Sequence, residues 1–488
     1  MKTSLRASVG ILPLLCIPAV LADNNNTPQP VDVAIVGGGL SGLAAAKVLS
    51  DAGKTFTILE ARDRVGGRVQ NQDLKNGGVT ELGAAFVGPT QDRVLALAAS
   101  LNLTLIPEYN AGDVVAVFAN STLKYSTASP IPPIDDESSK LLLQTIAFLE
   151  TTAGTINTTA PWTHPNATVW DGQTVATFFE EQSHPVGTVR CSLLDVSITS
   201  IFSAESAELS LFYALSYIAS AGNATTPGSF IRLISVDNGA QQSRIAGGTA
   251  LLATGLASQI GLSNIQLNSP VRSIAQQPDG TYLLTTTSGC TTSARKVIVA
   301  MSPPLASRIE YTPPLPASRD QLTQRMFMGS LAKATAIYST PFWRASNISG
   351  QALSDFGTVR ATYDVSPADG SYGAILGFVE ADRARAIDDL TDEEIQKEVV
   401  EDYVRYFGEQ ARDVKEWVVK RWDNEVFSRG GPVALAGVGT LSRYGPALRE
   451  SVGGVFWAGT EASEFWVGYM DGALRSGERA AGEVLGAL

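Results

Sequence analysis

The spacing of hydrophobic positions near the N-terminus predicts a strand–helix–strand unit. Residues 31–36 (VDVAIV) form an apolar run typical of a buried strand, and residues 56–59 form a second one. The Ala-rich stretch 43–49 between them predicts a helix. A polar segment rich in Asn and Pro, residues 23–30, precedes the unit and is typical of a linker.

Further along the chain the pattern changes between helical and strand periods. Helices are predicted over 205–219, where apolar residues recur near helix spacing, over the acidic stretch 391–407, and over 471–485. Further strands are predicted at 265–267, 282–287, 296–300 and 454–458.

This order of elements predicts an α/β (α+β) fold with two interleaved domains. A chain of 488 residues is long enough for two cores. The first, Rossmann-like domain is assigned to 30–107, 245–321 and 425–488. The second, a mixed sheet with helices, is assigned to 108–244 and 322–424.

Composition and charge exclude several classes of function. The formal net charge of -12 makes nucleic acid a poor partner. The only histidines, His164 and His184, lie in polar, Pro-containing stretches that predict surface loops. A histidine-based triad and a histidine-rich metal site are therefore not expected, and no metal site is predicted.

The N-terminus predicts export. Residues 1–22 combine Lys2 and Arg6, a short apolar run and a small-residue cleavage site ending at Ala22, which is typical of a signal peptide. No second hydrophobic span follows, so we expect a secreted, N-glycosylated protein without a membrane anchor. Seven Asn-x-Ser/Thr sequons agree with this, at Asn25, Asn102, Asn120, Asn157, Asn166, Asn223 and Asn347.

Cysteine leaves two alternatives open. Cys16 would leave with the signal peptide, and Cys191 and Cys290 remain. These two could form a disulfide in an oxidising compartment, or both could be buried thiols.

A glycine-rich turn lies between the first strand and the first helix. Residues 37–42 (GGGLSG) fit the G-x-G-x-x-G pattern, with Gly37 for the tight turn, Gly39 for close approach of a pyrophosphate and Gly42 for helix–strand packing. Ser41 lies in the same turn, and the helix N-terminus offers free amides to the phosphates. Glu60, at the end of the second strand, is placed to accept the ribose hydroxyls. The sequence therefore predicts a dinucleotide site.

The residues after Glu60 favour FAD over a nicotinamide cofactor. They read ARDRVGGR, residues 61–68, in which Arg64 and Arg68 flank a glycine pair and could hold a pyrophosphate. The chain has no second G-x-G-x-x-G, so molecular oxygen is the simplest electron acceptor. From this stretch we assign Ala61, Arg62, Gly67 and Arg68 to the cofactor site.

Four ordered motifs resemble those of the monoamine oxidase family, over residues 31–485. They are 60–68, 81–90 (ELGAAFVGPT), 329–333 (GSLAK) ahead of 341–343 (PFW), and 459–461 (GTE) with 468–472 (GYMDG). The resemblance implies a two-domain flavoprotein that oxidises a small amine with O2, releasing aldehyde or ketone, ammonia and hydrogen peroxide.

The resemblance also implies roles for individual residues. Lys333 would hold a water near flavin N5 that assists the reaction with oxygen, and Tyr469 would form one wall of an aromatic cage that steers the amine. The Met470 backbone would lie at the N1/C2 edge of the flavin, and Val271 would meet the adenine. Further assignments are Gly83, Ala84, Ala85 and Glu461 to the cofactor, Gln241 and Ile234 to the substrate, Trp422 to the flavin or the core, and Trp466 to the core.

Two departures from the family pattern change what is expected. Animal monoamine oxidases attach their flavin through a cysteine, whereas residues 429–433 here read RGGPV, with neither a thiol nor an aromatic ring. FAD should therefore be noncovalent, and half of the cage is missing, which puts an aromatic-amine preference in doubt. The signal peptide and the lack of an anchor resemble soluble microbial amine oxidases, including those that deaminate long-chain aminopolyol toxins.

Three alternatives remain. An L-amino-acid oxidase needs an arginine to bind the substrate carboxylate, and Arg232 is the candidate. A polyamine oxidase is another close alternative. A protein that binds flavin without turnover belongs to a different class, since function resides in sites rather than folds.

Overall fold

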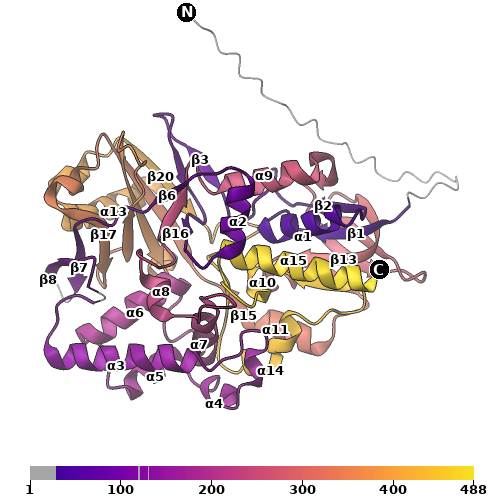
Figure 1. Cartoon of the computed structure of the whole chain (residues 1–488), viewed down its shortest axis with the longest axis horizontal. Coiled ribbons are helices and arrows are strands. Elements are labelled where there is room, and N and C mark those ends of the chain that lie inside the picture. The colour runs from indigo at the N-terminus through magenta and orange to yellow at the C-terminus, as the bar shows by residue number, and fades with distance from the viewer. Residues whose placement is uncertain (1–28, 119–120, 130) are drawn as a thin grey trace, which may run out of the picture.

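The computed structural model describes residues 29–488 except 119–120 and 130 (Figure 1). The predicted signal peptide, Cys16 and the sequons Asn25 and Asn120 lie outside the described residues.

An eight-stranded sheet carries the glycine-rich turn. Its order is β10-β2-β1-β13-β12-β11-β14, with β22 also paired to β13. β10, β2, β1, β13 and β22 run parallel to one another, as in Rossmann-like sheets. The strands are β1 (Val31–Val36), β2 (Phe56–Leu59), β10 (Ile265–Gln266), β11 (Val271–Gln276), β12 (Tyr282–Thr286), β13 (Thr291–Ala300), β14 (Glu310–Thr312) and β22 (Val455–Ala458).

Helices α1 (Leu40–Asp51), α9 (Ala250–Ile260) and α15 (Met470–Ala487) pack together on this sheet. In Figure 1 the first and last helices of the chain lie side by side, which brings the glycine-rich turn next to the C-terminal motif. The predicted strands 31–36 and 56–59 are confirmed. β13 begins earlier than predicted, at Thr291, because residues 291–294, of which the first three are polar, pair with β12.

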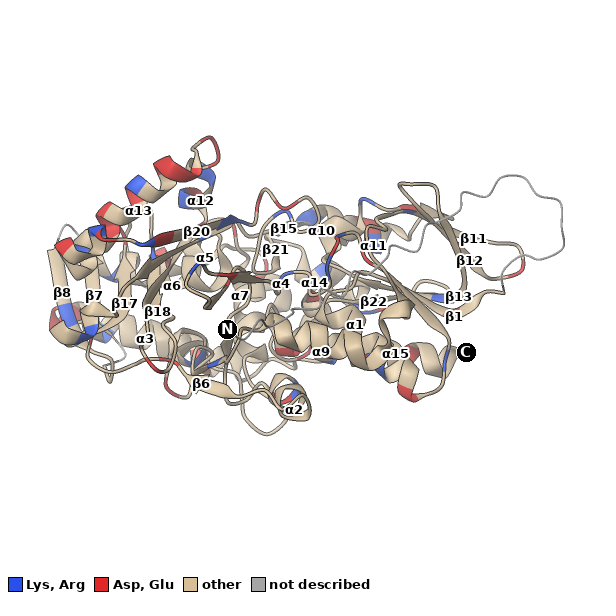
Figure 2. Ribbon diagram, turned by 90° about the horizontal axis from the view of Figure 1, so that it is seen from above, with Lys and Arg blue, Asp and Glu red and all other residues tan. Residues whose placement is uncertain are grey.

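A seven-stranded sheet forms the second layer system, in the order β20-β16-β19-β18-β17-β7-β8. Its strands are β7 (Asp113–Phe118), β8 (Ser121–Ser126), β16 (Leu331–Tyr338), β17 (Ile348–Ser354), β18 (Ala361–Asp364), β19 (Gly373–Glu380) and β20 (Glu416–Arg421). α13 (Asp392–Phe407) covers its outer side, with charged residues along its length (Figure 2). Thr391 caps this helix in a capping box with Glu394, which confirms the start predicted from the sequence.

A helical layer lies beneath the second sheet, below and to the left in Figure 1. It includes α3 (Asp136–Ala153), α5 (Val175–Glu181), α6 (Val189–Phe202), α7 (Leu211–Ser220) and α8 (Phe230–Ile234). The helix predicted over 205–219 begins at Leu211. Ser210 is the N-cap, with its side chain accepting from the Tyr213 amide, and the Glu208 carboxylate holds the Glu205 amide in the preceding turn.

The structure also decides two expectations about single residues, His184 and Cys191. His184 was predicted in a surface loop, but it is fully buried, with Nε2 2.6 Å from the Thr145 hydroxyl and the ring against Phe179. Cys191 is a free, buried thiol, so it forms no bridge to Cys290. Among the described residues, no helix is long and apolar enough to cross a membrane.

Candidate cofactor and active site

A cavity of about 520 Å³ runs between the two sheets. At one end it is lined by the glycine-rich turn, the ends of β2 and β13 and the start of β11. At the other end the lining comes from β16, β19, α6 and α7. A site at the carboxyl ends of parallel strands is where dinucleotides bind in this kind of sheet.

The glycine-rich turn forms a cradle whose shape requires glycine at two positions. Gly37 has φ +105°, and a Cβ there would lie 2.7 Å from the Ala300 carbonyl oxygen. A Cβ on Gly42 would lie 2.0 Å from the Gly37 oxygen, so Gly42 allows α1 to pack on β1. Among the described residues, the atom nearest to a Cβ on Gly39 would be the Gly67 Cα at 3.9 Å, so the missing side chain leaves space in the cavity.

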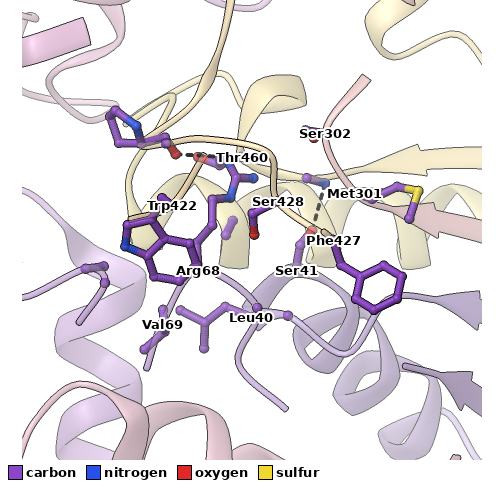
Figure 3. Close-up of a pocket in the computed structure, with 18 of the residues that line it drawn as sticks. Leu40, Ser41, Arg68, Val69, Met301, Ser302, Trp422, Phe427, Ser428 and Thr460 are labelled. Carbon is purple, nitrogen blue, oxygen red and sulfur yellow. Dashed lines mark hydrogen bonds between the residues drawn. The ribbon is translucent and has the colours of Figure 1, made fainter. Parts of the chain in front are cut away.

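The N-terminus of α1 faces this space without a side-chain cap. Its N-cap is Gly39, and within the described part of the chain no side chain accepts a capping hydrogen bond from it. Uncapped amides and the helix dipole together favour an anion such as a pyrophosphate. Ser41 is turned toward the C-terminal motif, where its hydroxyl accepts from the Gly459 amide (Figure 3).

Glu60 is fixed at the end of β2 by backbone amides. One carboxylate oxygen accepts from the Gly38 amide at 2.6 Å and the other from the Arg62 amide at 2.9 Å. Its side chain is buried and lines the cavity, as the ribose-binding role requires.

The three arginines after Glu60 have different surroundings. Arg68 lines the cavity and donates to the Glu461 carboxylate and the Pro432 carbonyl, both at 2.8 Å (Figure 3). Arg62 also lines the cavity and pairs with Glu425. Arg64 instead donates to carbonyls of its own loop and does not line the cavity, so the expectation that it helps hold the pyrophosphate is wrong.

Lys333 occupies the other end of the cavity and is 3 % exposed. It lies on β16, between β20 and β19. Its Nζ donates to the carbonyls of Glu81 at 2.9 Å and Gly83 at 2.7 Å. Burial lowers the pKa of Lys333 to about 8, against the opposing pull of the buried Glu81 carboxyl. A lysine held in this way can donate a hydrogen bond into the cavity and exchange a proton near neutral pH.

The segment after Glu81 is held against Arg68 and Trp422. A Cβ on Gly83 would lie 1.9 Å from the Arg68 carbonyl oxygen, and Trp422 Nε1 donates to the Leu82 carbonyl at 2.8 Å. Gly83, Ala84, Ala85 and Trp422 all line the cavity.

Two tyrosines form walls of the cavity near the start of α15. Tyr469 is the N-cap of that helix, and its ring lies 6.3 Å from the ring of Tyr217 on α7, tilted by 45°. Sequence reasoning missed Tyr217. The residue lies in the stretch 205–219 that was predicted as a helix, but only the packing of this helix shows that it reaches Tyr469. Trp466 packs at 4.8 Å from Tyr469 and is fully buried, in agreement with its expected core role.

Taken together, most of the site residues predicted from the sequence line the cavity. Those that do are Gly37, Gly39, Ser41, Glu60, Ala61, Arg62, Gly67, Arg68, Gly83, Ala84, Ala85, Gln241, Val271, Lys333, Tyr469 and Met470. Gly42 and Glu461 lie behind it, where they hold α1 and Arg68 respectively. Ile234 does not line it either; it ends α8 and packs against the helical core.

Arg232 is not available as a carboxylate clamp. Its guanidinium donates to the Ala221 and Pro227 carbonyls, both at 2.6 Å, and it does not line the cavity. The feature on which the amino-acid oxidase alternative depended is therefore engaged elsewhere.

The cavity also contains polar groups that sequence reasoning did not find, Glu380 and Ser200. No local motif marks either residue, because β19 and α6 bring them together from distant parts of the chain. Neither Cys191 nor Cys290 lines the cavity. The described residues also contain no group of three or more His, Cys, Asp or Glu that could hold a metal ion.

Comparisons with known proteins agree with this geometry. Residues 40–485 match the family model for flavin containing amine oxidoreductase. AofH of Mycobacterium tuberculosis, named as a flavin-containing monoamine oxidase, is 37% identical over 465 residues, which cover 95% of this chain and 98% of that relative.

Two solved structures share the fold over 94% of this chain and 99% of their own. Cyclohexylamine oxidase from Brevibacterium oxydans IH-35A is 31% identical, with a TM-score of 0.88. Wild-type putrescine oxidase bound to putrescine is 29% identical, with a TM-score of 0.87.

Proposed function

Because the chain belongs to the family of flavin-containing amine oxidoreductases, it is an FAD-containing enzyme that oxidises amines, and we propose that it is a secreted one. Its reaction would convert a primary amine to an aldehyde or ketone, with release of ammonia and hydrogen peroxide and O2 as electron acceptor. The signal-peptide pattern of residues 1–22 and the sequons support export.

The residues that line one end of the cavity fit the dinucleotide part of FAD. The uncapped α1 N-terminus, Glu60 and Arg68 would hold the pyrophosphate and ribose, and Val271 would lie at the adenine. FAD supplies two-electron chemistry between amine and oxygen when bound. We infer that it is held noncovalently, because Gly431 and Pro432 line the wall where a tethering thiol would be needed and neither Cys191 nor Cys290 does.

The chain's own contribution to catalysis is orientation, exclusion of water and placement of one proton-exchanging group. Tyr217 and Tyr469 would confine the amine and exclude water, and burial around them favours the neutral amine over its ammonium form. Lys333 would hold a water in the cavity through its third N–H, since two are used by the Glu81 and Gly83 carbonyls. This buried, doubly anchored lysine is the single observation that carries the proposal of catalysis over mere flavin binding.

Anaerobic reduction of the purified yellow holoenzyme tests this function. We expect pentylamine to bleach the flavin absorbance without oxygen and to release hydrogen peroxide in air. L-Norleucine, which adds only an α-carboxylate, should do so far more slowly because no free arginine awaits it at α8. Reduction by norleucine alone would restore the amino-acid oxidase alternative, and no reduction by any amine would support a flavin-binding protein without turnover.

A further inference from the structure

A carboxyl group at the end of β19 lies in the cavity without a protein partner. Glu380 is 2 % exposed, and among the described residues its buried Oε2 has no hydrogen-bond partner. Glu380 lines the same cavity as Lys333 and Tyr469. Leaving a buried polar group without a partner costs about 1–3 kcal/mol. Such groups are rare in folded proteins, so an unpartnered carboxyl oxygen in a cavity points to a missing ligand group.

The strand register fixes the side of the sheet on which this carboxyl lies. Lys333 is opposite Phe378, and Leu331 is opposite Glu380. Residues two apart on a strand share a face, so Glu380 lies on the face that carries Lys333, displaced by roughly 7 Å along β19. The carboxyl is therefore at a distance from the lysine that a short carbon chain could span.

A second unsatisfied group faces the same place from α6. Ser200 lines the cavity, and its Oγ is buried and, among the described residues, has no partner of hydrogen-bond geometry. It lies close enough to Glu380 to favour the ionised carboxylate. Two neighbouring polar groups on different elements thus line one cavity, and among the described residues Glu380 Oε2 keeps no partner, which indicates a place for a polar group of a ligand.

The charges around Glu380 favour a neutral ligand group over a cation. Burial raises the pKa of Glu380 to about 8, against the lowering effects of Ser200 and Arg360, while Glu205 adds to the rise. The carboxyl is then largely protonated at neutral pH and can both donate and accept a hydrogen bond. The positive charge of Arg360 near this carboxyl would repel a second ammonium group, whereas a hydroxyl can pair with both Glu380 and Ser200.

We propose that Glu380 and Ser200 bind a hydroxyl group on the carbon chain of the substrate, so that the enzyme selects amino alcohols over plain alkylamines. This inference rests on the proposed function and adds a substrate class to it. The hydroxyl would lie several carbons from the reacting amine, because Glu380 is displaced along the strand from Lys333.

A chain-length series tests the selection. The specificity constant kcat/KM would be measured with alkylamines, ω-amino alcohols and α,ω-diamines of three to eight carbons. At the best chain length the amino alcohol should exceed the matched alkylamine by roughly tenfold or more, the value of one well-made buried hydrogen bond. The diamine should fall below the amino alcohol.

Two substitutions separate the possible partners of the carboxyl. Glu380→Gln keeps a neutral donor and acceptor, so we expect it to retain most of the preference for the amino alcohol. Glu380→Leu removes both functions and should abolish that preference. Glu393→Gln, on the exposed surface of α13, is the matched control and should leave the preference unchanged.

A binding measurement provides a readout independent of turnover. Amines with a fully substituted α-carbon cannot be oxidised, and their binding can be followed by perturbation of the flavin absorbance. The dissociation constant should favour the hydroxylated amine in wild-type protein and lose that advantage in Glu380→Leu.

The outcomes are distinguishable. Oxidation of alkylamines with no advantage for any amino alcohol would overturn this inference but leave the proposed function intact. A diamine preference that Glu380→Gln abolishes would also overturn it and assign the carboxyl to an ammonium group. Failure to oxidise any amine would refute the proposed function itself, and the nonreactive ligands would still test whether Glu380 binds a hydroxyl.

Discussion

Lys333 combines deep burial with two hydrogen bonds to backbone carbonyls, which leaves one N–H for a ligand. Lys333→Met should therefore preserve the reaction with amine more than the reaction with oxygen. We expect the second-order rate of reoxidation by O2 to fall by about 100-fold, in the range typical of a positioned proton-exchanging group. Stopped-flow measurement of the two half-reactions would show this, with the exposed Lys397→Met as control. Equal losses in both half-reactions would contradict a role specific to oxygen.

Glu380 also makes the free energy of unfolding depend on pH, and its raised pKa decides whether stability rises or falls with pH. Its pKa is 4.5 when unperturbed and about 8 in the folded protein, so the folded state binds more protons than the unfolded state between these values. The contribution of the protonated carboxyl is fully present below about pH 4.5 and is lost as the pH rises through about 8. The loss is at most about 1.4 kcal/mol per pH unit.

Glu380→Gln, which stays neutral, should thus equal the wild type in stability near pH 5 and exceed it near pH 8. Urea unfolding of both holoenzymes at the two pH values measures the difference. A stability gain that does not grow with pH would show that the carboxyl is already ionised in the folded protein.

At the residue scale the sequence predicts best what is local. The glycine-rich turn and Glu60 were found because they lie within a short motif with a known chemical requirement, and Lys333 was found because the segment around it resembles that of the monoamine oxidase family. Tyr217, Ser200 and Glu380 were not found, because only the packing of α6, α7 and β19 brings them to the cavity. Arg64 was misassigned because a motif gives the position of a side chain along the chain but not its direction.

At the scale of elements, two glycines of the glycine-rich turn have different roles, one in helix packing and one in cofactor binding. Gly42→Ala places a methyl group 2.0 Å from the Gly37 oxygen, so it should destabilise the apoprotein itself. Gly39→Ala meets no protein atom within 3.9 Å and has an ordinary φ of -72°, so the apoprotein should be as stable or slightly more stable.

FAD affinity should fall in Gly39→Ala all the same, by about tenfold or more, because the methyl group fills the space left for the pyrophosphate. Flavin titration of the apoprotein, together with its Tm, separates the two effects. A Gly39→Ala protein with unchanged FAD affinity would mean that the cofactor does not approach this turn.

Elements were predicted well where their ends carry a chemical signal. β1 and β2 agree residue by residue with the apolar runs, and α13 begins at the capping box of Thr391. The helix 205–219 was begun too early because apolar spacing continues through the turn that Ser210 ends. Periodicity alone does not locate a helix start when the cap lies inside the periodic stretch.

At the scale of the whole molecule, the order of strand and helix patterns along the sequence was enough to suggest two domains built from alternating segments of the chain. The eight-stranded sheet draws its strands from 31–59, 265–312 and 455–458, and the seven-stranded sheet from 113–126 and 331–421. The cavity between them could not be predicted, because its shape depends on contacts such as Arg68 with Pro432 and Trp422 with Leu82, which join distant segments. The burial of His184 has the same origin, since Thr145 of α3 reaches it across the helical layer.

The surface of the whole molecule gives a test of export. Asn102, Asn157, Asn166 and Asn347 are exposed, whereas Asn223 is half-buried and its Nδ2, the atom that would carry a glycan, donates to Asp92 at 3.1 Å. Expression in a eukaryotic host should give secreted protein that begins after Ala22 and is glycosylated at exposed sequons but not at Asn223. Peptide mapping by mass spectrometry would show this, and Asn347→Gln should remove one glycan while Asn223→Gln removes none. Retention in the cytosol would contradict the proposed export. A glycan on Asn223 would show that its contact with Asp92 in the folded protein does not protect this side chain from modification.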